Sequence, residues 1–125
     1  MIMKKIAFVE DDLGILEVAR FIFEKAGYSV ALHGSAESLM AQLNPEPDIF
    51  ILDKQLPDMD GLELCRKLKA NPQTSAIPVL MLSANPQIKN LASAAGADAV
   101  MEKPFEIKEL LMVVGNLIAT VKLPL

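Results

Sequence analysis

Hydrophobic residues gather in short blocks along the chain, and in four of these blocks every position is apolar. A short block that is apolar throughout does not form one stripe of a helix, and it predicts a strand covered on both faces of a parallel sheet. A weaker block over residues 28–32 suits an edge strand. The four fully apolar blocks cover residues 6–9, 49–52, 79–82 and 99–101.

Between the blocks, apolar residues recur at the spacing of amphipathic helices. The first helix is expected between Asp12, which fits as an N-cap, and Gly27, which fits as a stop signal. Its expected apolar face consists of Ile15, Val18, Ala19, Ile22 and Ala26.

Four further helices complete the pattern. They are expected between Ser35 and Pro45, from Gly61 to about Asn71, over 88–95, and over 107–121, where one apolar face runs from Ile107 to Val121. Strand and helix therefore alternate five times with short connections, which predicts a single doubly wound α/β domain over residues 1–121. Residues 122–125 are expected to be a tail or the stub of a linker.

Length and composition exclude several classes of protein. The chain has 125 residues and one cysteine, Cys65, so we expect one domain without an internal disulfide or a thiolate metal site. Its apolar runs are too short for a membrane span, and Glu10 follows too soon for a signal peptide, so a cytoplasmic location is expected. The net charge of −4 argues against direct binding of nucleic acid.

Polar residues with related chemistry follow the predicted strands. Glu10 and Asp11 follow the first, Asp53 the third and Ser83 the fourth, and Lys103 lies just past the fifth. In an open parallel sheet these carboxyl ends meet at one edge, where ligands bind. Three carboxylates brought together repel one another and need a cation, and oxygen ligands favour Mg²⁺. With the added lysine and hydroxyl, the set predicts a pocket for a phosphoryl group carried on a carboxylate.

These residues carry a resemblance to the receiver domain of two-component response regulators. The similarity extends over almost the whole chain, and its five motifs occur in the family's order. The motifs lie at residues 9–12 (VEDD), 52–61 (LDKQLPDMDG), 78–84 (PVLMLSA), 96–98 (GAD) and 103–105 (KPF). The resemblance implies a five-stranded sheet in the flavodoxin-like order 2-1-3-4-5 with helices on both faces.

The resemblance also implies a role for each matching residue. Asp53 would be the phosphoacceptor, and Mg²⁺ would be bound by Asp11, Asp53 and the backbone carbonyl of Gln55, with Glu10 acting through water. Ser83, Lys103 and the backbone of Ala84 would bind the phosphoryl group, and Pro104 would form a cis turn. The implied donor is a sensor histidine kinase or a histidine phosphotransfer protein, and the domain would be a regulatory phosphoacceptor rather than an enzyme.

Two departures from the family pattern concern the output of the domain. The family usually has an aromatic switch residue three positions before the lysine, where this chain has Val100, and the segment from Ser83 to Lys103 is about two residues shorter than is typical. We therefore expect a shortened or shifted fourth helix and an atypical signal read-out through the face of the fourth helix, fifth strand and fifth helix. Gln55 and Asn85 occupy the positions that tune the lifetime of the phosphoryl group.

Two other functions remain as alternatives. One is an interaction module with the same fold that works without phosphate. The other is an aspartyl phosphatase, but such enzymes need a second acid two residues after the nucleophile, and this position is Gln55. His33 is expected at the surface after the second strand, and Cys65 is expected to be a small apolar residue of the core. The chain is expected to be a free-standing regulator, a phosphorelay shuttle or the receiver of a hybrid kinase.

Overall fold

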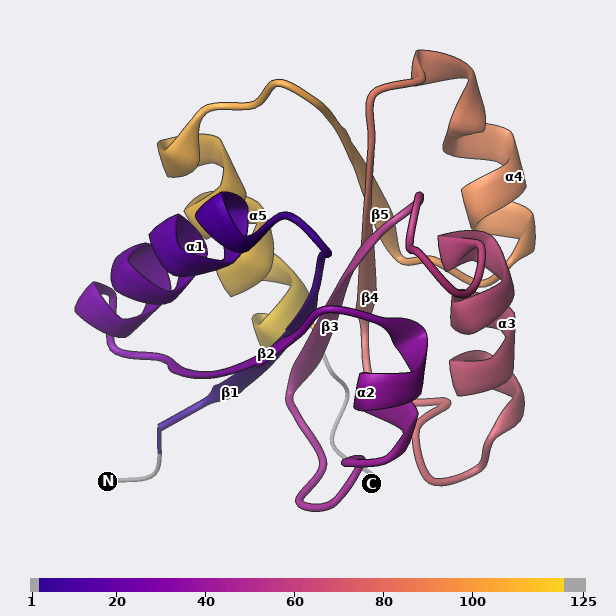
Figure 1. Cartoon of the computed structure of the whole chain (residues 1–125), viewed down its shortest axis with the longest axis horizontal. Helices are drawn as coiled ribbons and strands as arrows, with labels where there is room; N and C mark the ends of the chain where they lie inside the picture. Colours follow the sequence, from indigo (N-terminus) through magenta and orange to yellow (C-terminus); the bar gives the residue numbers. More distant parts are fainter. Residues whose placement is uncertain (1–2, 121–125) are drawn as a thin grey trace.

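The computed structural model describes residues 3–120, which form a five-stranded sheet flanked by helices (Figure 1). All neighbouring strands are parallel and their order is β2-β1-β3-β4-β5, which confirms the predicted doubly wound fold. The strands are β1 (Lys5–Val9), β2 (Ser29–His33), β3 (Ile49–Asp53), β4 (Val79–Ser83) and β5 (Ala99–Glu102). The helices are α1 (Leu13–Lys25), α2 (Ala36–Met40), α3 (Gly61–Ala70), the 3-10 turn η1 (Pro86–Ile88), α4 (Lys89–Ala94) and α5 (Ile107–Ala119).

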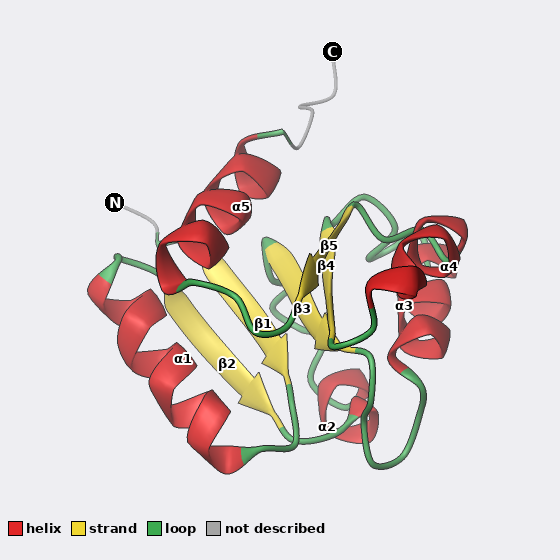
Figure 2. Ribbon diagram, turned by 90° about the horizontal axis from the view of Figure 1, so that it is seen from above, coloured by secondary structure: helices red, strands yellow, loops and turns green. Residues whose placement is uncertain are grey.

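The helices cover both faces of the sheet. Figures 1 and 2 show α1 and α5 on one face, and α2, α3 and α4 on the other. Successive residues of a strand point to opposite faces, so Ile51 packs in a core cluster with Phe23 of α1, and its neighbour Leu52 packs in a second cluster with Leu64 of α3. The central strands β3 and β4 are buried along their whole length, as their apolar sequences predict.

The fifth strand departs from the prediction of full burial. Ala99 and Val100 are only partly buried. β5 pairs with β4 alone and is therefore an edge strand, which the apolar block 99–101 did not indicate. The weaker block assigned to the second strand does lie at an edge, as predicted.

The buried face of α1 is also different from the predicted one. Leu16, Ala19 and Phe23 are buried, whereas Ile15 and Val18 are 38% and 55% exposed. This helix has apolar residues around most of its circumference, so periodicity alone allows more than one face, and contact with the sheet selects among them. The prediction of Asp12 as its cap is confirmed, because Asp12 Oδ1 accepts hydrogen bonds from the amides of Gly14 and Ile15.

α2 is shorter than predicted, and the buried face of α5 begins later than predicted. α2 ends at Met40, well before Pro45, and Leu43 packs against the core from beyond the helix. Ile107 at the start of α5 is 44% exposed, and within residues 107–119 the fully buried part of the face consists of Leu110 and Val114. The fourth helix is short, as predicted, with six residues after the turn η1.

Val121 and the predicted tail 122–125 lie outside the described residues. Among the helices formed by residues 3–120, none combines the length and the apolar character needed to cross a membrane.

Candidate functional site

The parallel sheet brings the predicted polar residues to one edge. Glu10 directly follows β1, and Lys103 directly follows β5. Asp53 and Ser83 were predicted to follow their strands directly, but each strand is one residue longer, so they are the last residues of β3 and β4. Their backbones are therefore fixed by the sheet, which positions the side chains better than a loop does.

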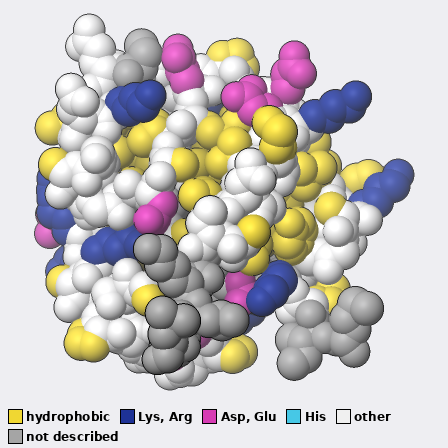
Figure 3. Space-filling model, turned by 180° about the vertical axis from the view of Figure 1, so that it is seen from behind, with side chains coloured by type: hydrophobic (Ala, Val, Ile, Leu, Met, Phe, Trp, Pro, Cys, Tyr) yellow, Lys and Arg dark blue, Asp and Glu magenta, His cyan; other side chains and the backbone are white. Residues whose placement is uncertain are grey.

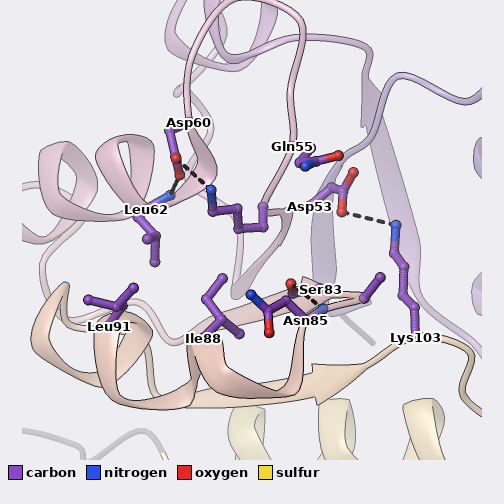
Figure 4. Close-up of a pocket in the computed structure, with 11 residues that line it drawn as sticks. Asp53, Gln55, Asp60, Leu62, Ser83, Asn85, Ile88, Leu91 and Lys103 are labelled. Carbon is purple, nitrogen blue, oxygen red and sulfur yellow. Dashed lines mark hydrogen bonds and ion pairs between the residues drawn. The ribbon is translucent and has the colours of Figure 1, made fainter.

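Lys103 is the centre of the site. Its Nζ donates hydrogen bonds to Asp53 Oδ1 at 2.9 Å and to Glu10 Oε1 at 3.0 Å (Figure 4 shows the bond to Asp53). Burial lowers the pKa of the Lys103 ammonium, but the hydrogen bonds and charges of the two carboxylates outweigh it and raise the pKa above its usual value. Lys103 therefore stays charged and neutralises part of the acidic cluster.

Glu10 is the most buried of the acidic residues, with 2% of its surface exposed. Its second oxygen, Oε2, accepts a hydrogen bond from the amide of Asp11 at 3.0 Å. Burial raises the pKa of Glu10, and the nearby Asp53 charge adds to this, while Lys103 acts in the opposite direction. Keeping this carboxylate ionised requires positive charge nearby.

The acidic cluster has the chemistry of a hard-cation site. Glu10, Asp11 and Asp53 each have a carboxylate oxygen within 4.8 Å of those of the other two. Asp11 is exposed, whereas Glu10 and Asp53 are buried, so the cluster opens to solvent on the Asp11 side. Oxygen ligands that are partly open to water match what Mg²⁺ accepts in proteins. The residues present therefore fit the ion that the sequence implies.

A cavity of about 550 Å³ opens beside Asp53. Gln55, Ser83, Ala84 and Asn85 line it together with Asp53 and Lys103, so the structure brings together the residues predicted to flank the phosphoacceptor. The wall also contains three apolar residues that were not predicted to belong to the site: Leu62, Ile88 and Leu91 (Figure 4). The spacing of Ile88 and Leu91 predicts a face of the fourth helix, and nothing in the sequence indicates that these three residues line a cavity.

Ser83 already has a partner within this cavity. Its Oγ accepts a hydrogen bond from the amide of Asn85 at 3.0 Å. Asn85 Oδ1 in turn accepts a hydrogen bond from the amide of Gln87 and caps the turn η1. The hydroxyl hydrogen of Ser83 remains able to donate to a ligand, because a hydroxyl both donates and accepts.

The loop between β3 and α3 is closed at its base. Lys54 Nζ pairs with Asp60 Oδ2 at 2.7 Å, and Asp60 Oδ1 caps α3 by accepting from the amide of Leu62. Gly61 lies directly against Asp53, and a Cβ at this position would overlap the carbonyl oxygen of Asp53. Residues 58–61 thus form the turn into α3, with a glycine where only a glycine fits.

Two further residues named from the sequence precede or follow Lys103 along the chain. The Lys103–Pro104 peptide bond is cis, as the resemblance implied. Val100 is partly buried and packs against the core cluster on the α3 and α4 side of the sheet. It occupies the expected position on β5 without an aromatic ring.

The prediction that His33 lies at the surface is wrong. His33 is the last residue of β2 and is only 3% exposed. Its Nδ1 is 2.8 Å from Ser38 Oγ of α2, and its carbonyl oxygen accepts a hydrogen bond from the amide of Glu10. The sequence block 28–32 ends one residue too early, and the partner that permits burial of the polar ring lies on the next helix, where periodicity does not show it.

The burial of His33 predicts a pH dependence of stability. Burial lowers the pKa of the imidazole, with a smaller contribution from the charge of Lys5. A histidine whose pKa is lower in the folded state binds its proton more readily when unfolded, so it destabilises the fold as the pH falls below about 6.5. We expect urea unfolding to give a steeper loss of stability from pH 7.5 to pH 5.5 for the wild type than for His33→Gln. Parallel pH profiles would contradict this.

Comparison with known proteins agrees with the geometry of the site. The family model described as "Response regulator receiver domain" matches residues 6–115. The DNA-binding dual master transcriptional regulator RpaA of Synechocystis sp. is 38% identical over 114 residues, which cover 87% of this chain and 46% of that protein. The chain thus spans about half the length of the curated relatives it matches.

Two solved structures show the same fold. The signal receiver domain of a signal transduction histidine kinase from Syntrophus aciditrophicus is 31% identical, with a TM-score of 0.88, and the match covers 98% of this chain and 95% of that one. The chemotaxis response regulator CheY4 of Vibrio cholerae is 27% identical, with a TM-score of 0.87 and coverage of 93% and 99%. Since the family model matches most of its length, this chain belongs to the family of response regulator receiver domains.

Proposed function

We propose that this receiver domain takes a phosphoryl group onto Asp53 in a Mg²⁺-dependent step and that phosphorylation changes the binding of a downstream protein. The observation that carries the proposal is the position of Lys103 Nζ, 2.9 Å from Asp53 Oδ1, beside a cluster of three carboxylates. Phosphoryl transfer depends on positioning and on neutralisation of charge more than on covalent help. The end of the buried strand β3 positions the Asp53 carboxylate, and the neighbouring Lys103 ammonium neutralises charge, so the site supports both requirements.

The bond changes in the proposed step are simple. One oxygen of the Asp53 carboxylate attacks the phosphorus atom of a phosphohistidine and forms a new P–O bond. The P–N bond to the donor breaks, and its electron pair leaves with the imidazole, which is neutral when its other ring nitrogen carries a proton. The product is an acyl phosphate on Asp53.

The residues that would hold the metal are Asp11, Asp53 and the backbone carbonyl of Gln55. When bound, Mg²⁺ neutralises the charge on the oxygens of the phosphoryl group. Glu10 would act through water, and its contacts support this, since its two oxygens already accept hydrogen bonds from Lys103 and from the amide of Asp11.

The transferred group would be bound by residues on the other side of Asp53. Lys103 would move its hydrogen bond from the carboxylate to a phosphoryl oxygen, Ser83 would donate its hydroxyl hydrogen, and the amide of Ala84 would donate from the end of β4. The uncharged side chains of Gln55 and Asn85 line the same cavity and would set the access of water to the acyl phosphate.

The proposed donor is a sensor histidine kinase or a histidine phosphotransfer protein, because the family works in two-component systems. The chain matches less than half of a relative named as DNA-binding, and that name concerns the whole relative. The net charge of −4 supports the expectation that this domain does not itself bind nucleic acid. That expectation and the cytoplasmic location stay predictions.

The proposed output surface is formed by α4, β5 and α5. Leu91 of α4 and Met112 of α5 are 56% and 60% exposed, and Val100 of β5 is partly buried. Figure 3 shows hydrophobic side chains gathered in the middle of the face opposite to the view of Figure 1. Because Val100 has no ring to swing inward, we propose that read-out depends on the short segment of η1 and α4 in a way that is atypical for the family.

The phosphorylation itself is tested with a small acyl phosphate. Incubation of the protein with Mg²⁺ and acetyl phosphate is expected to add one phosphoryl group, as measured by intact mass, and EDTA is expected to prevent it. A model phosphoester such as p-nitrophenyl phosphate is not expected to be turned over, since Gln55 stands where a phosphatase needs its second acid.

The same experiment separates the alternatives. Absence of an adduct from a folded protein with Mg²⁺ present would favour the phosphate-independent interaction module. Rapid turnover of the phosphoester would favour the aspartyl phosphatase. An adduct that forms equally well in EDTA would contradict the proposed role of the metal.

A further inference from the structure

Asp58 connects the loop between β3 and α3 to a helix elsewhere in the chain. Its Oδ1 accepts a hydrogen bond from the amide of Ala36 at 3.0 Å, and its Oδ2 accepts one from the amide of Glu37 at 2.9 Å. These are the first two amides of α2, which have no partner within the helix. Figure 2 shows the loop that leads from β3 into α3 running past α2. The hydrogen bonds from Glu37 and Ala36 lower the pKa of Asp58, so the carboxylate is ionised at neutral pH.

The cap of α2 comes from two different parts of the chain. Ser35, directly before the helix, uses its side-chain Oγ to accept a hydrogen bond from the amide of Ser38. The amides of Ala36 and Glu37 donate instead to Asp58, which lies 22 and 21 residues away from them in the sequence. Asp58 therefore fixes the tip of its loop, while the Lys54–Asp60 ion pair fixes the base.

This loop carries one side of the proposed cation site. Gln55, whose carbonyl would bind the metal, lies between the ion-paired base and the anchored tip. Gln55 also forms an isolated antiparallel bridge with Asp60. The position of the Gln55 carbonyl relative to Asp53 therefore depends on how firmly both ends of the loop are held.

The other side of the cation site is connected to the same helix. The amide of Glu10 donates to the carbonyl oxygen of His33, and the His33 ring contacts Ser38 of α2. A hydrogen-bonded path thus runs from Glu10 through β2 and α2 to Asp58. One end of the path is Glu10, next to Asp11, and the other end is Asp58, on the loop that carries the Gln55 carbonyl.

We propose that Asp58 is a positioning residue of the cation site, which it serves by fixing the loop of Gln55 to α2 and thereby to the strand end that carries Glu10 and Asp11. The proposal rests on the proposed function, since it takes the acidic cluster as a Mg²⁺ site. Asp58 does not touch the ion, and its effect is on the preorganisation of the residues that do.

An Asp58→Asn substitution tests this with little change of volume. The asparagine keeps one acceptor oxygen but places an NH₂ group opposite the second amide of α2, so one of the two hydrogen bonds is replaced by a contact between two donors. Groups that orient metal ligands typically contribute 10- to 100-fold to affinity. We expect the dissociation constant for Mg²⁺ to rise about tenfold, at the low end of that range because Asp58 acts on a loop rather than on a ligand side chain.

The matched control is Asp48→Asn. Asp48 is also an aspartate that accepts a backbone amide from a distant segment, with Oδ2 at 2.7 Å from the amide of Lys5. It lies just before β3, at the end of the sheet opposite to the site. Its substitution is expected to lower stability without changing the affinity for Mg²⁺.

The chain has no tryptophan, so binding is best followed by amide chemical shifts of ¹⁵N-labelled protein titrated with MgCl₂. A tenfold weaker affinity in Asp58→Asn with wild-type affinity in Asp48→Asn supports the proposal. Equal affinities in wild type and Asp58→Asn, or equal losses in both variants, overturn it while the metal site stands. Absence of Mg²⁺ shifts in the wild type overturns the metal site and this inference together. If Asp58→Asn does not fold, the Mg²⁺ affinity of Asp58→Ala, which removes both acceptor oxygens, is compared with the wild type and with Asp48→Asn in the same way.

Discussion

Asp53→Asn is expected to abolish the phosphoryl adduct formed with Mg²⁺ and acetyl phosphate while the domain stays folded. An amide has the shape of the carboxylate but lacks the anionic oxygen that attacks phosphorus. Lys103 keeps its hydrogen bond to Glu10, so this partly buried cation retains a partner in the variant. The loss is expected to be complete rather than partial, because the other carboxylates of the site are assigned to the metal or to capping.

Intact mass after incubation, with folding checked by circular dichroism, measures this result. Asp60→Asn, tested at saturating Mg²⁺, is the matched control, since Asp60 lines the same cavity, asparagine is an equally good cap for α3, and excess ion offsets a loss of affinity caused by the missing charge opposite Lys54. We expect that control to keep the adduct. Persistence of the adduct in Asp53→Asn would show that another residue is the acceptor, and loss of the adduct in both variants would point to a general disturbance of the loop.

The position of the site could be predicted because it follows from local signals with a known geometric consequence, whereas the strand order was implied by the resemblance to receiver domains. An apolar block such as 49–52 predicts a buried strand, and parallel strands place their carboxyl ends at one edge. Glu10, Asp53, Ser83 and Lys103 were therefore placed together correctly without any knowledge of their contacts. The same rule does not decide which strands lie at an edge, and Ala99 and Val100 of β5 are more exposed than their sequence suggests.

The features that could not be predicted depend on contacts between distant segments. Ile15 and Val18 are as apolar as Leu16 and Phe23, and only packing against the sheet decides which pair is buried. His33 is a polar residue at a strand end, and Ser38 of α2 gives its buried ring a hydrogen-bond partner. In the sequence, Asp58 is one acidic residue of the motif 52–61, and its contact with α2 becomes visible only when the loop is placed beside the helix.

The site also shows how one lysine changes the balance of a buried acidic cluster. The sequence indicated that three carboxylates would need a cation, and the structure places Lys103 where it contacts two of them. Lys103 and a bound Mg²⁺ would neutralise the same negative charge. The stability of the domain without the metal should therefore depend strongly on Lys103, and the dependence should weaken when Mg²⁺ is bound.

Lys103→Met is accordingly expected to lower the free energy of unfolding by about 3 kcal/mol in Mg²⁺-free buffer at neutral pH, the low end of the cost of removing one partner from a buried ion pair. Glu10 is 2% exposed and would lose its only contact with a cation among residues 3–120. Methionine fills much of the lysine stem's volume, so the loss is mainly electrostatic.

Removing Lys103 would raise the already raised pKa of Glu10 further. A carboxyl group with a raised pKa in the folded state favours that state once it is protonated, so the deficit should shrink as the pH is lowered toward 5.

Urea unfolding of Lys103→Met and wild type, with EDTA and with saturating Mg²⁺, measures this effect. Bound Mg²⁺ stabilises the folded state by mass action and replaces the missing charge, so we expect it to recover most of the difference. Lys54→Met is the control, since the Lys54–Asp60 pair is more exposed, at 30% and 46%, and a surface pair contributes about 1 kcal/mol or less. Equal losses in the two lysine variants, or a loss in Lys103→Met that Mg²⁺ leaves unchanged, would mean that Lys103 stabilises the domain by packing and that the acidic cluster does not depend on its charge.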